Sequence, residues 1–139
     1  MIPQTTASSS VTPCLLIVDD DDSVREVFRC ILQSEYRIIE ACGVDEALSL
    51  IDRECPDLVT LDIRMPEKNG LEGLRLIRER NANLPIVMIA DFSSIDTACE
   101  ALRLGASDYL KKPFGPNHLL TSIRKNLKKS RHYHGPSAL

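Results

Sequence analysis

Short apolar segments alternate with longer amphipathic segments along most of this chain, and this alternation restricts its fold more than any other feature. The short segments have the length of buried strands, and the longer ones carry apolar residues at helical spacing. The expected strands are 14–18, 36–41, 57–61, 85–89 and 108–110. The expected helices begin near residues 23, 44, 70, 95 and 116. Such alternation predicts an α/β fold, a parallel sheet with helices on both faces.

Right-handed crossover connections leave few topologies for a sheet of this kind. We expect a doubly wound, flavodoxin-like sheet of five parallel strands in the order 2-1-3-4-5, with five helices and a ligand site between strands 1 and 3. A single domain should occupy residues 13–129. Residues 1–12, rich in Thr and Ser, are expected to form a disordered lead-in, and residues 130–139 a flexible tail.

The composition narrows the classes of function. The 139 residues fit one domain, and a formal net charge of −3 gives no reason to expect a domain that binds nucleic acid directly. Basic residues near the end of the last helix are explained by favourable interaction with the helix C-terminus: Arg124, Lys125, Lys128, Lys129 and Arg131. No segment reaches the roughly 20 apolar residues of a membrane span, so no membrane contact is expected.

Five cysteines are scattered through the chain without a CxxC pair, so a zinc site is not expected. Cys30, Cys42 and Cys99 lie within or beside apolar-patterned segments. This placement predicts small buried thiols in a reducing cytosol, and therefore a cytoplasmic location.

Charged residues follow three of the expected strands at the points where these strands end. They are Asp19–Asp22 after the first strand, Asp62 after the third, and Lys111 and Lys112 after the fifth. Because strands 1 and 3 are neighbours in the expected order, Asp19, Asp20 and Asp62 should converge. Carboxylates suit Mg²⁺, and a lysine adds a point charge that a phosphoryl group can meet. The combination predicts phosphoryl chemistry with an acceptor carboxylate.

Each of these features also has an ordinary explanation. Consecutive aspartates are common in solvated turns and at helix N-termini, and an Asp before a Pro-containing turn is commonly a turn former. A Lys-Lys-Pro run is commonly exposed to solvent. Unrelated surface charges, however, have no reason to fall at the ends of three strands, so the joint arrangement favours a site.

At this level of detail the chain resembles the receiver domain of bacterial two-component response regulators over nearly its whole expected domain. The matching segments are Leu15–Asp21, Leu61–Pro66 with Gly70, Pro85–Met88, Gly105–Leu110 and Lys112–Phe114. No one segment is specific, but the combination is.

The resemblance implies that Asp62 accepts a phosphoryl group from a sensor histidine kinase or a phosphotransfer protein. Asp19 and Asp20 would hold Mg²⁺, with Asp62 and the backbone carbonyl of Arg64 as further ligands. Lys112 would pair with the phosphoryl oxygens. The domain would be a phosphoacceptor with self-catalysed phosphorylation and dephosphorylation rather than an enzyme with turnover.

The resemblance also implies a cis peptide bond before Pro113, which an X-Pro bond permits at modest cost. Tyr109 matches the aromatic residue whose rotamer reports activation, although it could equally be a core residue at a strand end. The family uses the face formed by its fourth helix, fifth strand and fifth helix for homodimers and partners, and we expect the same face to serve here.

The chain departs from the family at Ala90, where a Thr or Ser normally bonds the phosphoryl group through its hydroxyl. Such a bond to a charged group is worth roughly 1.5–3 kcal/mol, about as much as the ~1–3 kcal/mol of a typical allosteric coupling. We therefore expect weakened transmission from Asp62 to Tyr109. Asp91, the next residue, either repels phosphate or faces solvent, and solvent is the expectation.

Two alternatives follow from these departures. A phosphorylation-independent receiver would keep the fold as an interaction domain and lose the switch at Ala90. A metal-dependent phosphatase would use Asp62 as its nucleophile, but such enzymes place a second acid where this chain has Arg64.

Arg64 and Phe92 are also bulky at the places that flank the path of the hydrolytic water in the family, which suggests slow loss of phosphate.

Overall fold

The described residues of the computed structural model, 12–91 and 95–137, contain one sheet of five parallel strands in the order β2-β1-β3-β4-β5. The strands are β1 (Cys14–Val18), β2 (Arg37–Ala41), β3 (Leu58–Asp62), β4 (Ile86–Ala90) and β5 (Asp108–Lys111). This is the predicted strand order, and each strand boundary lies within one residue of the expected one. The predicted lead-in lies, apart from Thr12, outside the described residues.

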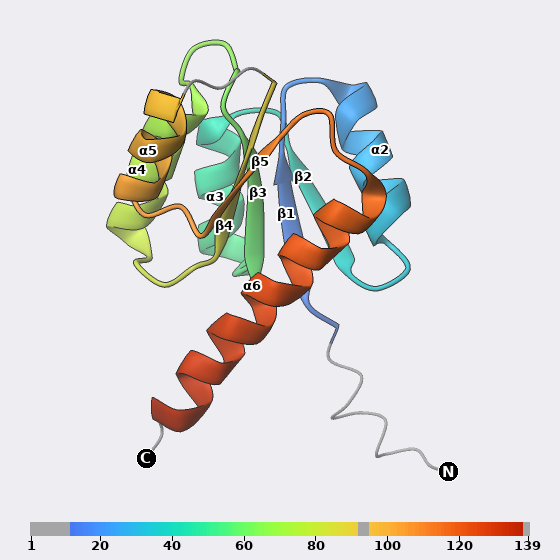
Figure 1. Cartoon of the computed structure of the whole chain (residues 1–139), viewed down its shortest axis with the longest axis vertical. Helices are drawn as coiled ribbons and strands as arrows, with labels where there is room; N and C mark the ends of the chain where they lie inside the picture. The colour runs from blue at the N-terminus through green and yellow to red at the C-terminus, as the bar shows by residue number, and fades with distance from the viewer. Residues whose placement is uncertain (1–11, 92–94, 138–139) are drawn as a thin grey trace.

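Helices cover both faces of the sheet, as the sequence predicts (Figure 1). They are α2 (Asp22–Leu32), α3 (Val44–Glu54), α4 (Gly70–Arg80), α5 (Ile95–Arg103) and α6 (Pro116–Ser137). α3, α4 and α5 pack on one face, whereas α2 and α6 pack on the other. The last helix, α6, extends beyond Lys129, where the sequence predicted the end of the domain, and past the edge of the sheet (Figure 1).

Alternating residues of the strands supply two separate hydrophobic cores. On β1, Leu16 and Val18 face the core beneath α3, α4 and α5, whereas Leu15 and Ile17 face the core beneath α2 and α6. All residues of β1, β3 and β4 are buried. A parallel sheet buried on both faces explains why these strands are continuous apolar runs and not alternating ones.

The start of α2 differs from the sequence-based prediction. Ser23 and Glu26 have the spacing of a capping box, but Asp21 is the N-cap, and its side chain accepts a hydrogen bond from the backbone N–H of Ser23 at 2.8 Å. Aspartate is among the strongest N-cap residues, so the cap that lies nearer the strand begins the helix earlier. Gly105, two residues after the end of α5, has a positive φ of 105°, the conformation in which glycine commonly ends a helix.

The predicted burial of the cysteines is wrong. Cys30, Cys42 and Cys99 are exposed, and Cys14 is the buried thiol of the part of the chain described. Desolvation by burial raises the pKa of Cys14. An apolar-patterned segment identifies an amphipathic helix without showing that each small residue on it faces inward.

No helix within the described ranges has the length and apolar character needed to cross a membrane.

Candidate phosphoacceptor and metal site

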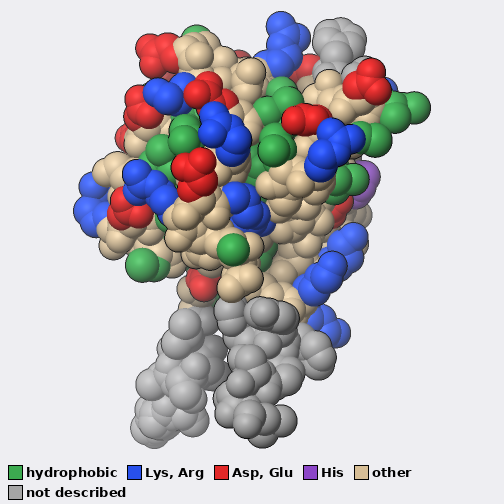
Figure 2. Space-filling view, turned by 90° about the vertical axis from the view of Figure 1, so that its left-hand side faces the viewer, with side chains coloured by type: hydrophobic (Ala, Val, Ile, Leu, Met, Phe, Trp, Pro, Cys, Tyr) green, Lys and Arg blue, Asp and Glu red, His purple; other side chains and the backbone are tan. Residues whose placement is uncertain are grey.

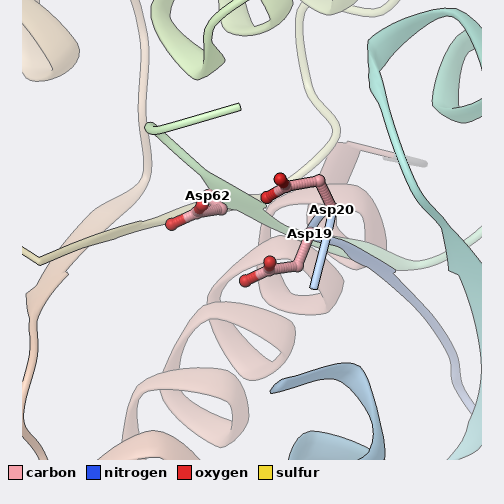
Figure 3. Close-up of side chains that lie close together, drawn as sticks. All are labelled: Asp19, Asp20 and Asp62. Atoms are coloured by element: carbon pink, nitrogen blue, oxygen red, sulfur yellow. The ribbon is translucent and has the colours of Figure 1, made fainter. Parts of the chain in front are cut away.

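Three acidic side chains meet at the carboxyl ends of β1 and β3, which are neighbours in the sheet (Figure 3). Asp19 and Asp20 follow the last residue of β1, and Asp62 is the last residue of β3. One carboxylate oxygen from each residue lies within 4.8 Å of the others. The structure therefore brings together the three acids that the sequence predicted would converge.

The backbone around Asp19 is held by a small network. Its N–H donates to the carbonyl of Ala41 at 3.1 Å, and its carboxylate accepts from the N–H of Asp21 at 2.9 Å. The guanidinium of Arg25 donates to the carbonyl of Asp19 and pairs with Glu40 at 3.1 Å. The network ties the loop after β1 to β2 and α2, which limits the positions that the Asp19 carboxylate can take.

The N-terminus of α4 supports Asp62 from the other side. Gly70, the first residue of this helix, donates its N–H to the carbonyl of Ile63 at 2.8 Å. Asn69 caps the helix by accepting from the N–H of Glu72 at 3.0 Å. The turn between β3 and α4 is thereby closed immediately behind Asp62, so this side chain is presented from a fixed backbone.

Burial and like charges disfavour ionisation of the acceptor. Burial, followed by the neighbouring charge of Asp19, raises the pKa of Asp62 to about 7 against the opposing effect of Lys112. Burial also raises the pKa of Asp19. Oδ1 of Asp62 is buried and has no hydrogen-bond partner among the described residues. Carboxylates in this state are suited to a divalent cation, which would neutralise their repulsion and satisfy the free oxygen.

Lys112 lies beside the acids, at the end of β5. Its Nζ is 3.9 Å from Oδ1 of Asp62 and 3.3 Å from Oδ1 of Asp91. The peptide bond between Lys112 and Pro113 is cis, as the resemblance implied. Asp91 is 44% exposed, so it does face solvent, but it also pairs with Lys112. This pairing was missed from the sequence, where only the nearness of Asp91 to the site was visible.

The two predicted switch residues lie on adjacent strands. Ala90 ends β4, is 1% exposed and offers only a methyl group. Tyr109 of β5 is opposite Met88 and packs against the core beneath α3, α4 and α5. Its hydroxyl is buried and has no hydrogen-bond partner in the described part of the chain. Tyr109 is therefore partly buried against this core, and its role as a switch residue stays a prediction.

Two surface hollows border the loop between β3 and α4. One of about 450 Å³ is lined by Asp20 and by residues of the loops before α3 and α4, including Lys68. The other, of about 440 Å³, is lined by Arg64 and its neighbours in the loop between β3 and α4. Arg64 is exposed, and Phe92, its expected companion beside the water path, lies outside the described residues. Of the three acids, Asp20 is exposed beside the first hollow, whereas Asp19 and Asp62 are buried.

The face formed by α4 and α5 carries interspersed acidic, basic and apolar side chains (Figure 2). Two large apolar residues of α5 are conspicuously exposed, Ile95 at 80% and Leu102 at 54%. Ala101 is the one residue of this helix that is fully buried. The helical spacing of apolar residues predicted α5 correctly, but it did not show that part of the apolar surface faces outward.

Comparison with solved structures gives close matches to this fold. The receiver domain of NtrX from Brucella abortus superposes with a TM-score of 0.78 at 35% identity, over 82% of this chain and 98% of that one. A CheY-like response regulator receiver domain protein from Methanospirillum hungatei JF-1 superposes with a TM-score of 0.83 at 29% identity, over 87% of this chain and 98% of that one.

Curated relatives point in the same direction. Response regulator MprA of Mycobacterium sp. (strain KMS) is 38% identical over 125 residues, which cover 89% of this chain and 54% of MprA. The alginate biosynthesis transcriptional regulatory protein AlgB of Pseudomonas aeruginosa is 36% identical over 114 residues, 81% of this chain and 25% of AlgB. The chain thus spans about half or less of the length of these relatives.

The family model of the response regulator receiver domain matches residues 15–124, which include the five strands except for Cys14 and every residue of the candidate site. Together with the sheet order and the acids at its carboxyl edge, this match leaves one conclusion. The chain belongs to the family of response regulator receiver domains of two-component systems.

Proposed function

We propose that this receiver domain accepts a phosphoryl group on Asp62 from the phosphohistidine of a sensor histidine kinase or a phosphotransfer protein. The observation that supports the proposal most strongly is the state of the Asp62 carboxylate. Its Oδ1 is buried and without a hydrogen-bond partner among the described residues, 3.9 Å from an ammonium group and beside two further acids. Such an oxygen is free to form a bond to an incoming phosphoryl group, which carries its own charge.

The proposed reaction is an exchange of one bond at phosphorus. A carboxylate oxygen of Asp62 attacks the phosphorus atom, and the P–N bond of the phosphohistidine breaks. The leaving imidazole keeps the electron pair of that bond and takes up a proton, and Asp62 becomes an acyl phosphate. Attack of water on the same phosphorus later returns the carboxylate and inorganic phosphate. The chain would thus be changed by its own chemistry and not turn over a substrate.

Asp19, Asp20 and Asp62, with the backbone carbonyl of Arg64, would hold Mg²⁺ in this proposal. The fit rests on the oxygen-only ligand set, the mutual approach of the acids and the raised pKa of Asp62. Bound Mg²⁺ would neutralise charge on the transferring phosphoryl oxygens. Lys112, whose Nζ is 3.9 Å from Asp62, would contribute a second positive charge.

A phosphorylation-independent interaction domain is the second candidate, and the buried Ala90 favours it because no hydroxyl is available there to follow the phosphoryl group. In either case we propose that the domain works in the cytoplasm through the face of α5, β5 and α6, as a homodimer or with a partner. The exposed Ile95 and Leu102 on α5 support an apolar contact on this face.

The two candidates are separated by a phosphate-affinity gel after incubation with acetyl phosphate and Mg²⁺. A retarded band that is absent in Asp62→Ala and after removal of Mg²⁺ by a chelator supports the phosphoacceptor. An unshifted wild-type protein would favour the phosphorylation-independent domain. A phosphatase, the third alternative, would instead release phosphate from a model phosphoester over many turnovers.

A further inference from the structure

Lys112 is shared between two carboxylates in this structure, and it lies nearer to the one outside the predicted metal site. Its Nζ is 3.3 Å from Asp91 and 3.9 Å from Asp62. The Lys112 side chain is 25% exposed, whereas those of Asp91 and Asp62 are 44% and 7% exposed. A single ammonium therefore has a hydrated partner and a buried partner within reach.

A backbone hydrogen bond also joins Lys112 to the end of β4. The N–H of Lys112 donates to the carbonyl of Ala90 at 2.7 Å, so the last residue of β4 and the residue after it are both bound to Lys112. Asp91 leads from β4 toward α5, which begins at Ile95. A change in the partner of the Lys112 ammonium therefore acts on Asp91, four residues before the start of α5.

Among the five helices of the described structure, α5 has the fewest fully buried residues. Ala101 is its one fully buried residue, and its apolar residues Ile95 and Leu102 are largely exposed. A helix with few buried contacts has a low free-energy cost of displacement, so that a single ion pair at its entrance can affect its position.

We propose that Asp91 holds Lys112 in the unphosphorylated domain and releases it when Asp62 is phosphorylated, so that this exchange of ion pairs moves the start of α5. The inference rests on the proposed function and names a regulator of the same site. No covalent bond changes in the exchange: the ammonium leaves one carboxylate and joins the phosphoryl oxygens. Asp91 thus supplies a connection between the phosphoryl group and α5 that the methyl group of Ala90 cannot supply.

The direction of the exchange follows from charge. A phosphoryl group on a side chain carries about −1.5 to −2 charges and strong acceptor oxygens, more than the single charge of the carboxylate it replaces. It attracts Lys112 more strongly than before and repels Asp91. Asp91 is partly hydrated already and loses little on release, because an exposed ion pair contributes little to stability. The phosphoryl group thus interacts differently with the two arrangements, which is the condition for a shift between them.

The exchange predicts two effects of removing Asp91 that have opposite senses. Without a competing carboxylate, Lys112 is free for the phosphoryl group, so Asp91→Asn should bind a phosphoryl mimic more tightly, by about two- to fivefold, which corresponds to loss of an exposed ion pair. The response of α5 to that mimic should fall below half of the wild-type shift, because no ion pair remains to be broken. A residue with a merely structural role would not increase binding while it decreases the response.

The test is an NMR titration of the full chain with beryllofluoride and Mg²⁺, which follows backbone amides of residues 95–103 and of residues beside Asp62. Asp91→Asn is compared with Asp91→Glu, which keeps the charge and should recover part of the response. Asp96→Asn is the matched control: it removes one exposed acid of α5 that makes no ion pair with Lys112 in the described part of the chain, and it should behave as wild type. The spectra themselves show whether each variant is folded.

The outcomes separate the inference from the function on which it rests. Wild type that binds the mimic, with an α5 shift that Asp91→Asn largely abolishes, supports the exchange. Equal α5 shifts in wild type and Asp91→Asn, or no α5 shift in a wild type that does bind, overturn the exchange and leave the phosphoacceptor standing. A wild type whose amides beside Asp62 do not respond at all overturns both.

Discussion

A Cβ atom on Gly70 would stand 2.3 Å from the backbone oxygen of Asp62. The same atom would lie 2.6 Å from the Cα of Ile63, so the obstruction is backbone that no side-chain movement can relieve. Glycine is therefore required for α4 to begin this close to the end of β3. The first turn of α4 and the candidate phosphoacceptor behave as one packed unit, and damage to one should be measurable in the other.

Gly70→Ala should lower the free energy of unfolding by about 3 kcal/mol, the upper range for overpacking a tight site. It should also slow phosphorylation of Asp62, because the strand end must move. Urea denaturation and acetyl phosphate labelling measure the two effects. Gly115→Ala is the control: no atom lies within 4 Å of its added Cβ, and it should cost less than about 1 kcal/mol. Equal losses in the two variants would contradict this account of Gly70.

Asp62→Asn should stabilise the metal-free domain, and the gain should depend on pH. Folding raises the pKa of Asp62 from 3.8 to about 7, so the stability present when this carboxyl is protonated is lost as the pH rises between those values. The amide does not ionise and avoids this loss, which reaches about 4 kcal/mol at most. Denaturant titrations of both proteins in a chelator from pH 5 to 8 should show a difference that grows up to about pH 7 and then levels off. A difference independent of pH would refute the assignment to Asp62.

Mg²⁺ should reverse much of this penalty in the wild-type protein. An ion that binds only the folded state stabilises it by about 2.7 kcal/mol at a concentration 100 times its dissociation constant. Thermal unfolding at pH 8 should therefore shift upward with Mg²⁺ in wild type and much less in Asp62→Asn and Asp19→Asn. Na⁺ at matched ionic strength separates site binding from general screening. Identical shifts in all three proteins would show that the ion acts elsewhere.

The acid cluster could be predicted because its members lie at the ends of strands. Features that depend on the direction of side chains could not be predicted from the sequence. Asp19 and Asp62 follow apolar runs whose order in a parallel sheet is restricted, so their convergence follows from the chain itself. The ion pair between Lys112 and Asp91 depends instead on the directions of these two side chains, which follow different strands. The spacing of residues in the sequence does not determine those directions. The exposure of Ile95 could not be predicted for a similar reason. Helical spacing shows that apolar residues share one side of a helix, but it does not show which of them other elements cover.

Ala90→Thr should increase the response of α5 and Tyr109 to phosphorylation, because the hydroxyl would give the phosphoryl group a hydrogen bond worth roughly 1.5–3 kcal/mol. Ala90→Val is the matched control, since valine has nearly the shape of threonine without a donor. Chemical shifts with and without beryllofluoride measure the response. If valine enlarges the shift as much as threonine does, size and not hydrogen bonding is responsible.

The identity of the phosphorylated atom is the central claim, and chemical trapping tests it most directly. The domain is incubated with acetyl phosphate and Mg²⁺, reduced with borohydride, and digested for peptide mass spectrometry. An acyl phosphate is reduced to the alcohol, so an aspartyl phosphate yields homoserine at its position. We predict homoserine at position 62 and nowhere else, with none in a sample lacking acetyl phosphate. Homoserine at another aspartate, or at none, would contradict the account.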